Sequence, residues 1–265
     1  MTTYEQTPLF SNTSAAQNEK DTLLTCKVQY GDIWQLGVHK LLCSDCRTHD
    51  EIAFLMQGET AKLALHDPPY GLRSRMAFGF GDGDVVGSRI KVKRGSFLPV
   101  YDDDKTFDPQ HLLTSGSVVI IWGANHFADK LPASPAWILW DKRVDIFSND
   151  MSDGEAAWVS IGNTLRIIHH KWNGFDRASE RGIPRVHPTQ KPIEVQSQII
   201  RKYTHENELV TDWYAGSGTT LIAAEITKRR AYVCEIEPHY CNVILSRYEK
   251  ATGKTATLIH RTASQ

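Results

Sequence analysis

Residues 62–70 read KLALHDPPY, a short apolar run that ends in an acid, two prolines and an aromatic residue. The run has the length and alternation of a buried strand, and in open α/β sheets ligands bind where such strands end. Pro68 and Pro69 have no N–H groups and hold the backbone extended, which leaves the Pro68 carbonyl as a free acceptor. With Asp67 and the ring of Tyr70, this set suits a planar ligand carrying an exocyclic amine. Alone, the stretch also fits a strand before a plain Pro-Pro turn.

Strand and helix patterns alternate along the rest of the chain. Ser117–Trp122 is a continuous apolar run, typical of a parallel strand covered on both faces. Further strands are predicted at 39–43, 136–140, 156–161, 164–170, 209–214 and 231–235. Helices are predicted at 49–56, at 192–204, at 219–230, in a short piece ending at Leu131, and from Pro238 onward. Gly162-Asn163 between two of the strands indicates a hairpin. The alternation predicts an α/β fold with a doubly wound, mostly parallel sheet.

One folded domain is expected over residues 23–265, preceded by a flexible polar segment, 1–22. Residues 71–107 show no periodicity and are rich in glycine. A loop of this length in a compact domain is usually functional or disordered. Its place directly after Tyr70 suggests a mobile lid, and a dispensable surface insertion is the alternative.

Composition narrows the class of protein. The chain has 265 residues and a net charge of −1, with no membrane-length apolar run and no visible signal peptide. Five cysteines, an odd number, indicate reduced thiols and a cytoplasmic protein. Cys43 and Cys46 have CxxC spacing but no second pair, so no metal site is expected. The charge excludes a histone-like binder, whereas eight cations against three acids between 161 and 202 allow local phosphate contacts.

A second site is predicted at residues 211–220, TDWYAGSGTT, which follow a strand and open a helix. Glycines let the backbone approach a ligand closely. Glu235 ends the next strand, where an acid binds ribose hydroxyls. The turn lacks the third glycine of a dinucleotide site, and Asp212 would repel a pyrophosphate but suits an ammonium. The pattern therefore favours S-adenosyl-L-methionine over NAD, with a plain strand–turn–helix crossover as the third interpretation.

The three motifs and their order resemble the β (permuted) class of amino-group DNA methyltransferases. The catalytic motif is DPPY at 67–70, the linking motif HPTQKP at 187–192 and the cofactor motif DWYAGSGTT at 212–220. The resemblance extends from about Gly31 to Tyr248. One departure is Asp212-Trp213-Tyr214 where the family usually has Asp-Pro-Phe, although an aromatic residue remains at the phenylalanine position.

The resemblance implies the fold of S-adenosylmethionine-dependent methyltransferases, with a small target-recognition insertion at about 141–186. It implies that Asp67, Pro68, Pro69 and Tyr70 are catalytic. It also implies a cofactor pocket in which Glu235 holds the ribose, Asp45 approaches the adenine, and Asp212 and Gly216 line the methionine end. The remaining pocket residues are Thr189, Lys191, Pro192, Tyr214, Ser217, Gly218 and Thr219.

The implied reaction is methyl transfer from S-adenosyl-L-methionine to N6 of an adenine flipped out of double-stranded DNA. Family members that modify cytosine N4 more often have Ser in place of Asp67, so adenine is favoured. Cytosine N4, an RNA substrate and a non-catalytic DNA-binding regulator remain as alternatives. A bacterial or phage-encoded protein is implied. A homodimer and a cognate restriction nuclease are compatible partners that the sequence does not decide.

Overall fold

The computed structural model describes residues 27–71, 101–144, 152–173 and 176–261. The expected flexible segment 1–22 and most of the expected loop 71–107 lie outside these ranges. In the part of the chain that is described, no helix is long and apolar enough to cross a membrane.

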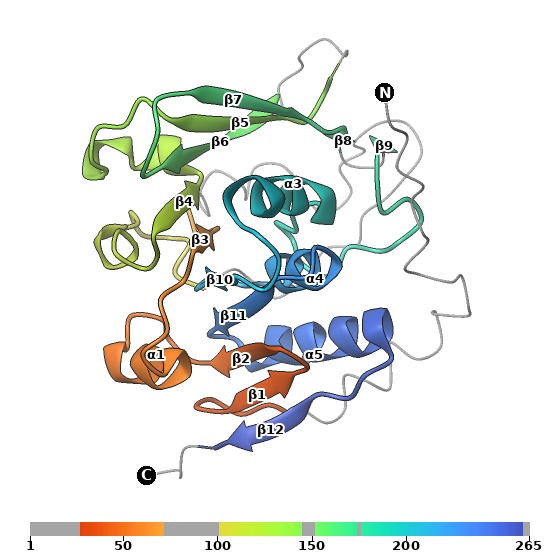
Figure 1. Cartoon of the computed structure of the whole chain (residues 1–265). Helices are drawn as coiled ribbons and strands as arrows, with labels where there is room; N and C mark the ends of the chain where they lie inside the picture. Colours follow the sequence, from red (N-terminus) through yellow and green to blue (C-terminus); the bar gives the residue numbers. More distant parts are fainter. Residues whose placement is uncertain (1–26, 72–100, 145–151, 174–175, 262–265) are drawn as a thin grey trace.

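A ten-stranded mixed sheet forms the centre of the molecule (Figure 1). Its strands are β1 (Ile33–Leu36), β2 (His39–Cys43), β3 (Leu63–His66), β4 (Val118–Trp122), β5 (Trp137–Asp141), β6 (Gly154–Val159), β7 (Leu165–His169), β10 (Leu209–Asp212), β11 (Arg230–Glu235) and β12 (Thr257–His260). Their order is β12-β1-β2-β11-β10-β3-β4-β6-β5-β7, and β2, β11, β10, β3 and β4 run parallel. Antiparallel pairs occur towards both margins, although the edge strand β7 is parallel to β5. The predicted α/β fold is confirmed, with its parallel part at the centre of the sheet.

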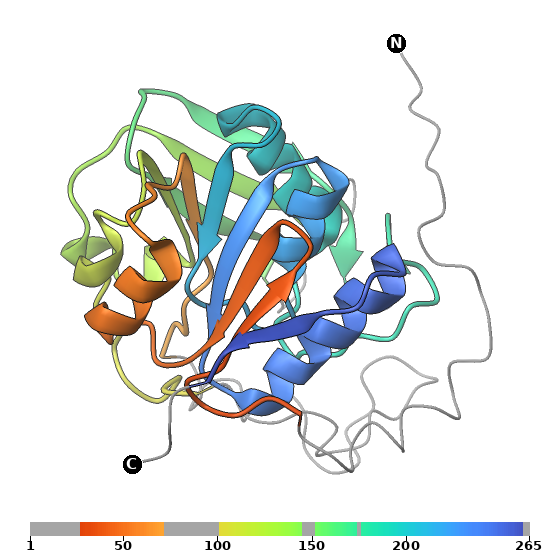
Figure 2. The same ribbon diagram turned by 60° about the horizontal axis from the view of Figure 1, so that its bottom comes forward.

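Helices cover both faces of the sheet, as Figures 1 and 2 show. The α-helices are α1 (His49–Met56), α3 (Ile193–Tyr203), α4 (Thr219–Ile226) and α5 (Pro238–Thr252), and the 3-10 helices are η1 (Gln110–Leu112), η2 (Ala124–His126) and η3 (Ala128–Lys130). Helices α3, α4 and α5 pack on one face, and α1 with the 3-10 helices packs on the other. Each face buries its own apolar cluster, so the sheet is covered on both sides as the apolar run of β4 predicts.

The last helix shows how the sequence sets its own boundaries. Pro238 occupies the first turn of α5, and the Glu237 side chain accepts a hydrogen bond from the His239 N–H. Gly253 ends the helix with a φ of 70°. Helix α5 therefore begins where the sequence analysis expects it, and it packs against β2 and β11.

The predicted hairpin is wrong, because β6 and β7 are not neighbours in the sheet. Strand β5 lies between them and pairs with β6 on one side and β7 on the other. Gly162 does adopt a left-handed turn, with a φ of 93°. A turn signal depends only on residues close in the sequence. It does not determine which strand pairs with the strand that follows the turn.

Two predicted helices differ in the structure, and strands are present that were not predicted. Helix α4 ends at Ile226, because Lys228 has a φ of 59° and Arg230 already belongs to β11. The short helix expected before Leu131 is two 3-10 helices, η2 and η3. The polar tail beyond Gly253 contains β12, which pairs with β1. A separate two-stranded sheet, β8 (Trp172–Asn173) with β9 (Asp176–Arg177), lies between β7 and α3.

Candidate active site

The predicted acids gather along one edge of the sheet. Asp45 follows β2, Glu235 ends β11, Asp212 ends β10 and Asp67 follows β3, and these four parallel strands are neighbours in that order. The backbone joins adjacent loops, since the Ser44 N–H donates to the Glu235 carbonyl at 3.1 Å. The carboxyl ends of the strands thus bring the two predicted sites together.

The glycine-rich turn after β10 wraps around the Glu235 carboxylate. Gly216 and Gly218 have φ values of 52° and 79°, in the left-handed region that favours glycine. The Gly216 N–H donates to Glu235 Oε2 at 2.7 Å, and the Glu237 N–H donates to Oε1 at 2.9 Å. Burial raises the pKa of Glu235 to about 7, although both N–H groups oppose this. Each carboxylate oxygen keeps a second lone pair, which suits ribose hydroxyls.

Arg247, which sequence reasoning missed, supports the same turn from α5. Its Nη1 donates to the Ser217 carbonyl at 2.6 Å and to the Ser217 hydroxyl at 3.0 Å. The same nitrogen lies 3.5 Å from Oγ1 of Thr219. Arg247 thus contacts the hydroxyls of Ser217 and Thr219 within the turn.

Asp212 holds the start of this turn by internal hydrogen bonds. Its Oδ1 accepts from the Tyr214 N–H at 3.0 Å, and its Oδ2 accepts from the Thr220 hydroxyl at 2.6 Å. The Trp213 N–H donates to Nδ1 of His66 at 3.0 Å, so that nitrogen carries no proton. Burial also lowers the pKa of His66, so its 3.9 Å approach to Asp212 is not an ion pair. Since His66 directly precedes the DPPY motif, this contact joins the two motifs.

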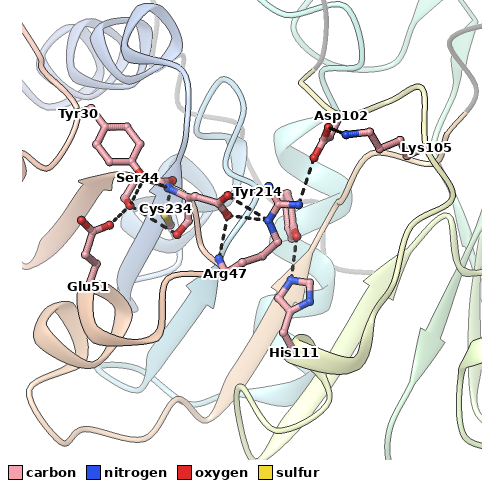
Figure 3. Close-up of polar contacts among 10 residues, drawn as sticks. Tyr30, Ser44, Arg47, Glu51, Asp102, Lys105, His111, Tyr214 and Cys234 are labelled. Carbon is pink, nitrogen blue, oxygen red and sulfur yellow. Dashed lines mark hydrogen bonds and ion pairs between the residues drawn. The ribbon is translucent and has the colours of Figure 1, made fainter.

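Tyr214 uses the hydroxyl that the family's usual phenylalanine lacks. The hydroxyl shares a hydrogen bond of 2.8 Å with Nε2 of His111 (Figure 3). The ring packs edge-on against Phe107. Cys46 lies beside it, and burial raises the pKa of that thiol to about 12. A thiol with so high a pKa is a poor nucleophile, so Cys46 is assigned no part in the reaction.

Asp45 lies in an ion-pair network at the end of β2. Arg47 Nη2 donates to Asp45 Oδ2 at 2.6 Å, and its Nε donates to Oδ1 at 2.9 Å. These hydrogen bonds lower the pKa of Asp45. Arg47 also reaches Asp102 at 3.1 Å, and the Asp45 N–H donates to the Tyr30 hydroxyl. Both oxygens of Asp45 are thus engaged by Arg47, which sequence reasoning did not single out.

The DPPY motif closes around a buried lysine. Lys191 Nζ lies 2.5 Å from Asp67 Oδ1 and 3.0 Å from Glu155 Oε2, and the Tyr70 hydroxyl donates to the same Asp67 oxygen at 2.5 Å. Lys142 pairs with the other oxygen of Glu155. No donor from the described ranges reaches Oδ2 of Asp67, which is therefore available to a ligand.

Burial and neighbouring charges change the pKa values of the three groups in this cluster, Asp67, Lys191 and Glu155, in different directions. Burial raises the pKa of Asp67, although Lys191 opposes the change. Burial would lower the pKa of Lys191, but the two carboxylates raise it, so the ammonium persists. Burial also opposes ionisation of Glu155, yet Lys191 and Lys142 lower its pKa to about 2. Glu155 is thus ionised beside the two lysines, whereas burial works against the ionisation of Asp67.

The ring of Tyr70 is seated against the turn that follows β4. Gly123 has a φ of 66°, and a Cβ atom there would lie 2.0 Å from the Tyr70 ring. His126 stacks on the ring with centroids 5.2 Å apart. On the backbone side, the Tyr70 N–H donates to Asp103 Oδ1 at 2.9 Å. The turn therefore needs a glycine at 123 to leave room for the aromatic ring.

The linking motif touches both halves of the site. His187 packs against Gly216, where a Cβ atom would lie 3.3 Å from its Nε2. Thr189 Oγ1 lies 3.2 Å from His187 Nδ1, and Pro192 precedes α3 as its N-cap residue. Lys191, expected in the cofactor pocket, places its ammonium on the catalytic motif. The segment thus connects the cofactor turn with Asp67.

Sequence reasoning missed several residues of the site because their roles depend on contacts between elements that are distant in the sequence. These residues are Glu155, Gly123, His126 and Asp103. Glu155 lies on β6, which reaches the motif only because β6 pairs with β4. Gly123 carried a local signal, because it directly follows a predicted buried strand, as Asp67 does. A glycine in that position marks a candidate site edge.

A family model described as DNA methylase (N6_N4_Mtase) matches residues 12–246. The chain belongs to the N6/N4 DNA methylase family. It is therefore a DNA methyltransferase, and S-adenosyl-L-methionine is its methyl donor. The family name covers both adenine N6 and cytosine N4, so membership leaves the modified base open.

Relatives of this methylase include type II methyltransferases. M1.MboII of Moraxella bovis is 33% identical over 263 residues, which cover 77% of this chain and 93% of that protein. M2.MboI of Moraxella bovis is 38% identical over 66 residues, 25% of this chain and 24% of the relative. The match with M2.LlaDCHI of Lactococcus lactis subsp. cremoris, 34% identical, covers 43% of this chain and 41% of the relative. Apart from M1.MboII, the chain thus spans less than half of the length of these relatives.

Solved structures with a similar fold have low sequence identity. The complex of M1.HpyAVI with S-adenosylmethionine has a TM-score of 0.45 and 17% identity, over 78% of this chain and 98% of that one. PvuII DNA methyltransferase, which is cytosine-N4-specific, has a TM-score of 0.44 and 13% identity, over 82% of this chain and 94% of that one.

Proposed function

We propose that this methylase transfers a methyl group to the exocyclic N6 of an adenine flipped out of double-stranded DNA. The observation that carries the proposal is the state of Asp67. One of its oxygens is held by Lys191 and Tyr70, and the other has no donor among the described residues. An acceptor fixed in this way suits the N–H of an amine.

The cofactor half offers a hydrogen-bond acceptor that suits the ribose hydroxyls of the methyl donor. Glu235 is a buried carboxylate with one lone pair left on each oxygen, and it lies beside a turn whose glycines adopt left-handed conformations. We assign the ribose hydroxyls to Glu235, the methionine end to the backbone of the turn from Asp212 to Thr219, and the adenine to the region of Asp45. When bound, S-adenosyl-L-methionine supplies an electrophilic methyl group.

The chain's own residues prepare the amine for attack. Asp67 Oδ2 and the Pro68 carbonyl accept the two amino hydrogens, which favours pyramidal nitrogen and concentrates its lone pair. The Asp67 carboxylate stabilises the positive charge that develops on that nitrogen. Lys191 and the Tyr70 hydroxyl hold Asp67 in one orientation, so that little reorganisation accompanies the reaction.

The extruded base needs an aromatic surface, and we assign it to Tyr70. His126 stacks on this ring in the structure, and Gly123 lies against it. A bound base therefore either displaces His126 or uses the part of the ring that His126 leaves uncovered. Base–aromatic stacking contributes about 1–3 kcal/mol, so Tyr70 supports binding of the base while Asp67 activates it.

Target recognition is assigned to residues 141–186. Within it, β6 and β7 belong to the central sheet, so readout falls to the rest of the segment, which includes the β8–β9 pair. There Arg177 lies 4.8 Å from the centre of the Trp172 ring. Residues 145–151 and 174–175 of this segment lie outside the described residues.

The biological setting is inferred from the similarity to type II methyltransferases. We propose action on DNA in the bacterial cytoplasm, in a host or phage context, with a cognate restriction nuclease as partner. A homodimer is compatible with this setting.

The proposal is tested with purified protein, S-adenosyl-L-methionine carrying a labelled methyl group, and nucleic acid from a methylation-deficient bacterium. Label should enter double-stranded DNA and leave RNA from the same cells unlabelled. Label in RNA alone would refute the choice of substrate, and a protein that binds the methyl donor without labelling either polymer would support a regulatory role.

A further inference from the structure

Residues 101–107 bring the chain back against the catalytic turn. Oδ1 of Asp103 accepts hydrogen bonds from the N–H groups of Tyr70 and Gly71, both at 2.9 Å. Gly71 has a φ of 74°, and a Cβ atom there would lie 2.6 Å from the Lys105 carbonyl oxygen. The segment around Asp103 is therefore packed directly on the turn that follows the DPPY motif.

The composition of the motif makes these two hydrogen bonds unusually important. Pro68 and Pro69 have no N–H groups, so the first two N–H groups after Asp67 belong to Tyr70 and Gly71. Both of them are bound by one carboxylate oxygen of Asp103. Hydrogen bonds to an ionised acceptor are stronger than neutral ones. Asp103 thus binds both of the first two backbone N–H groups that follow the prolines in the turn.

Asp102, the preceding residue, anchors the same segment to the cofactor half. Its Oδ2 accepts from Arg47 Nη1 at 3.1 Å, and its Oδ1 accepts from Lys105 at 3.0 Å (Figure 3). Arg47 also binds Asp45, as described above. Asp102 has a φ of 57°, a left-handed conformation that is unfavourable for a residue with a side chain. Contacts on both sides hold this strained residue in place.

We propose that Asp103 is a positioning residue for methyl transfer. By holding the N–H groups of Tyr70 and Gly71, Asp103 orients the Pro68 carbonyl and the Tyr70 ring. The ion pair between Asp102 and Arg47 fixes the position of Asp103 relative to Asp45. The inference rests on the proposed transfer at Asp67. It adds a residue that no motif of the sequence contains, and it explains why two consecutive acids face two different halves of the site.

The test compares three variants of the full chain. Asp103→Ala removes the acceptor, Asp103→Asn keeps an oxygen that can accept both N–H groups, and Asp104→Ala is the matched control, because Asp104 is the exposed neighbouring acid. Steady-state transfer to DNA from a methylation-deficient host gives kcat and the KM for the methyl donor. Thermal unfolding shows whether each variant is folded.

The alanine variant should lose kcat by on the order of 10- to 100-fold, since a misplacement near 1 Å costs about that much. Its KM for the methyl donor should stay within about twofold of wild type, because the turn at Gly216 is untouched. The asparagine variant should recover most of the loss, and Asp104→Ala should match wild type. An alanine variant with unchanged kcat, or an asparagine variant as slow as alanine, would overturn the proposal.

A second measurement does not depend on activity. Hydrogen exchange followed by mass spectrometry on the peptide spanning residues 66–71 reports the N–H groups of Tyr70 and Gly71. Exchange there should accelerate in Asp103→Ala and stay near wild type in Asp103→Asn and Asp104→Ala. Unchanged exchange in the alanine variant would refute the positioning role. If wild type itself transferred no methyl group, the proposed function would fail, and the exchange result would still decide whether Asp103 holds the turn.

Discussion

At the scale of single residues, Asp67 has one carboxylate oxygen, Oδ1, that contacts Lys191 and Tyr70, and a second, Oδ2, that accepts no hydrogen bond from the described residues. The isosteric change Asp67→Asn keeps the shape but removes the charge that stabilises the developing cation. It leaves Lys191 with Glu155 as its one carboxylate partner among the described residues. Transfer should fall by about 10²- to 10³-fold, while affinity for the methyl donor changes by less than about twofold. Isothermal calorimetry and label transfer measure the two effects. The exposed acid Asp129 supplies the control, Asp129→Asn, which should behave like wild type.

Glu235 should make cofactor binding depend on pH. Its pKa in the ligand-free protein is raised to about 7, and the carboxylate must be ionised to accept both ribose hydroxyls. Binding therefore favours the deprotonated form, and affinity is lost as the pH falls through 7. Linkage gives a Kd about tenfold weaker at pH 6 than at pH 8. Glu235→Gln should bind weakly and with little pH dependence, and equal wild-type affinity at both pH values would contradict the assignment.

Sequence patterns predicted the positions of the site residues that lie at the ends of strands. The apolar runs before Asp67, Asp212 and within β11 are local, and parallel strands align their carboxyl ends, so these positions could be foreseen. Partners supplied by other elements could not. Glu155 becomes a neighbour of Lys191 only through the pairing of β6 with β4, a long-range contact that no local pattern encodes.

At the scale of elements, strand order was the least predictable feature. The turn signal at Gly162 was real, yet β5 separates the two strands that it connects. The basic run after α4 was expected to extend that helix, but Arg229 donates to the Thr204 carbonyl and Arg230 pairs with Glu59. These tertiary contacts take both residues out of the helix, and they override the favourable interaction of cations with a helix C-terminus.

The turn between β4 and η2 provides a test of the close contact between Gly123 and the ring of Tyr70. Gly123→Ala adds a Cβ atom that would overlap the Tyr70 ring at 2.0 Å, at a φ of 66°. The left-handed conformation alone costs about 1–2 kcal/mol, and the clash should also displace Tyr70 and reduce transfer. Gly58→Ala is the matched control, because Gly58 has a φ of 79° with nothing within 4 Å.

Both variants should therefore unfold at a lower temperature than wild type, and only Gly123→Ala should lose transfer disproportionately. Thermal unfolding and label transfer on the same preparations give the comparison. Equal loss of transfer in the two glycine variants would show that strain, and not the seat of Tyr70, is responsible.

At the scale of the whole molecule, the C-terminal strand β12 completes the sheet and is tied to its first strand. Arg261 Nε lies 2.7 Å from Oδ1 of Asp32, a carboxylate with no exposed surface. Arg261→Ala should lower the unfolding temperature, because it leaves a buried charge without that partner, whereas Arg261→Lys should keep part of the effect.

The same ion pair has a defined dependence on pH. Although burial opposes it, Arg261 and the Gln29 N–H lower the pKa of Asp32 below 3.8. A depressed carboxyl pKa contributes stability above the unfolded value, and this contribution is lost as the pH falls through the folded value. The difference in unfolding temperature between wild type and Arg261→Ala should thus be present at pH 7 and shrink below about pH 4. A difference that persists at pH 2 would contradict this account.

The central claim is that Asp67 directs methyl transfer to adenine N6, and modified nucleosides test it most directly. The protein and its Asp67→Asn variant are expressed in a methylation-deficient bacterial host, and the host DNA is digested and analysed by mass spectrometry. We predict N6-methyladenine with the wild type and almost none with the variant. N4-methylcytosine would contradict the choice of base, and N6-methyladenine at equal levels with both proteins would contradict the role of Asp67.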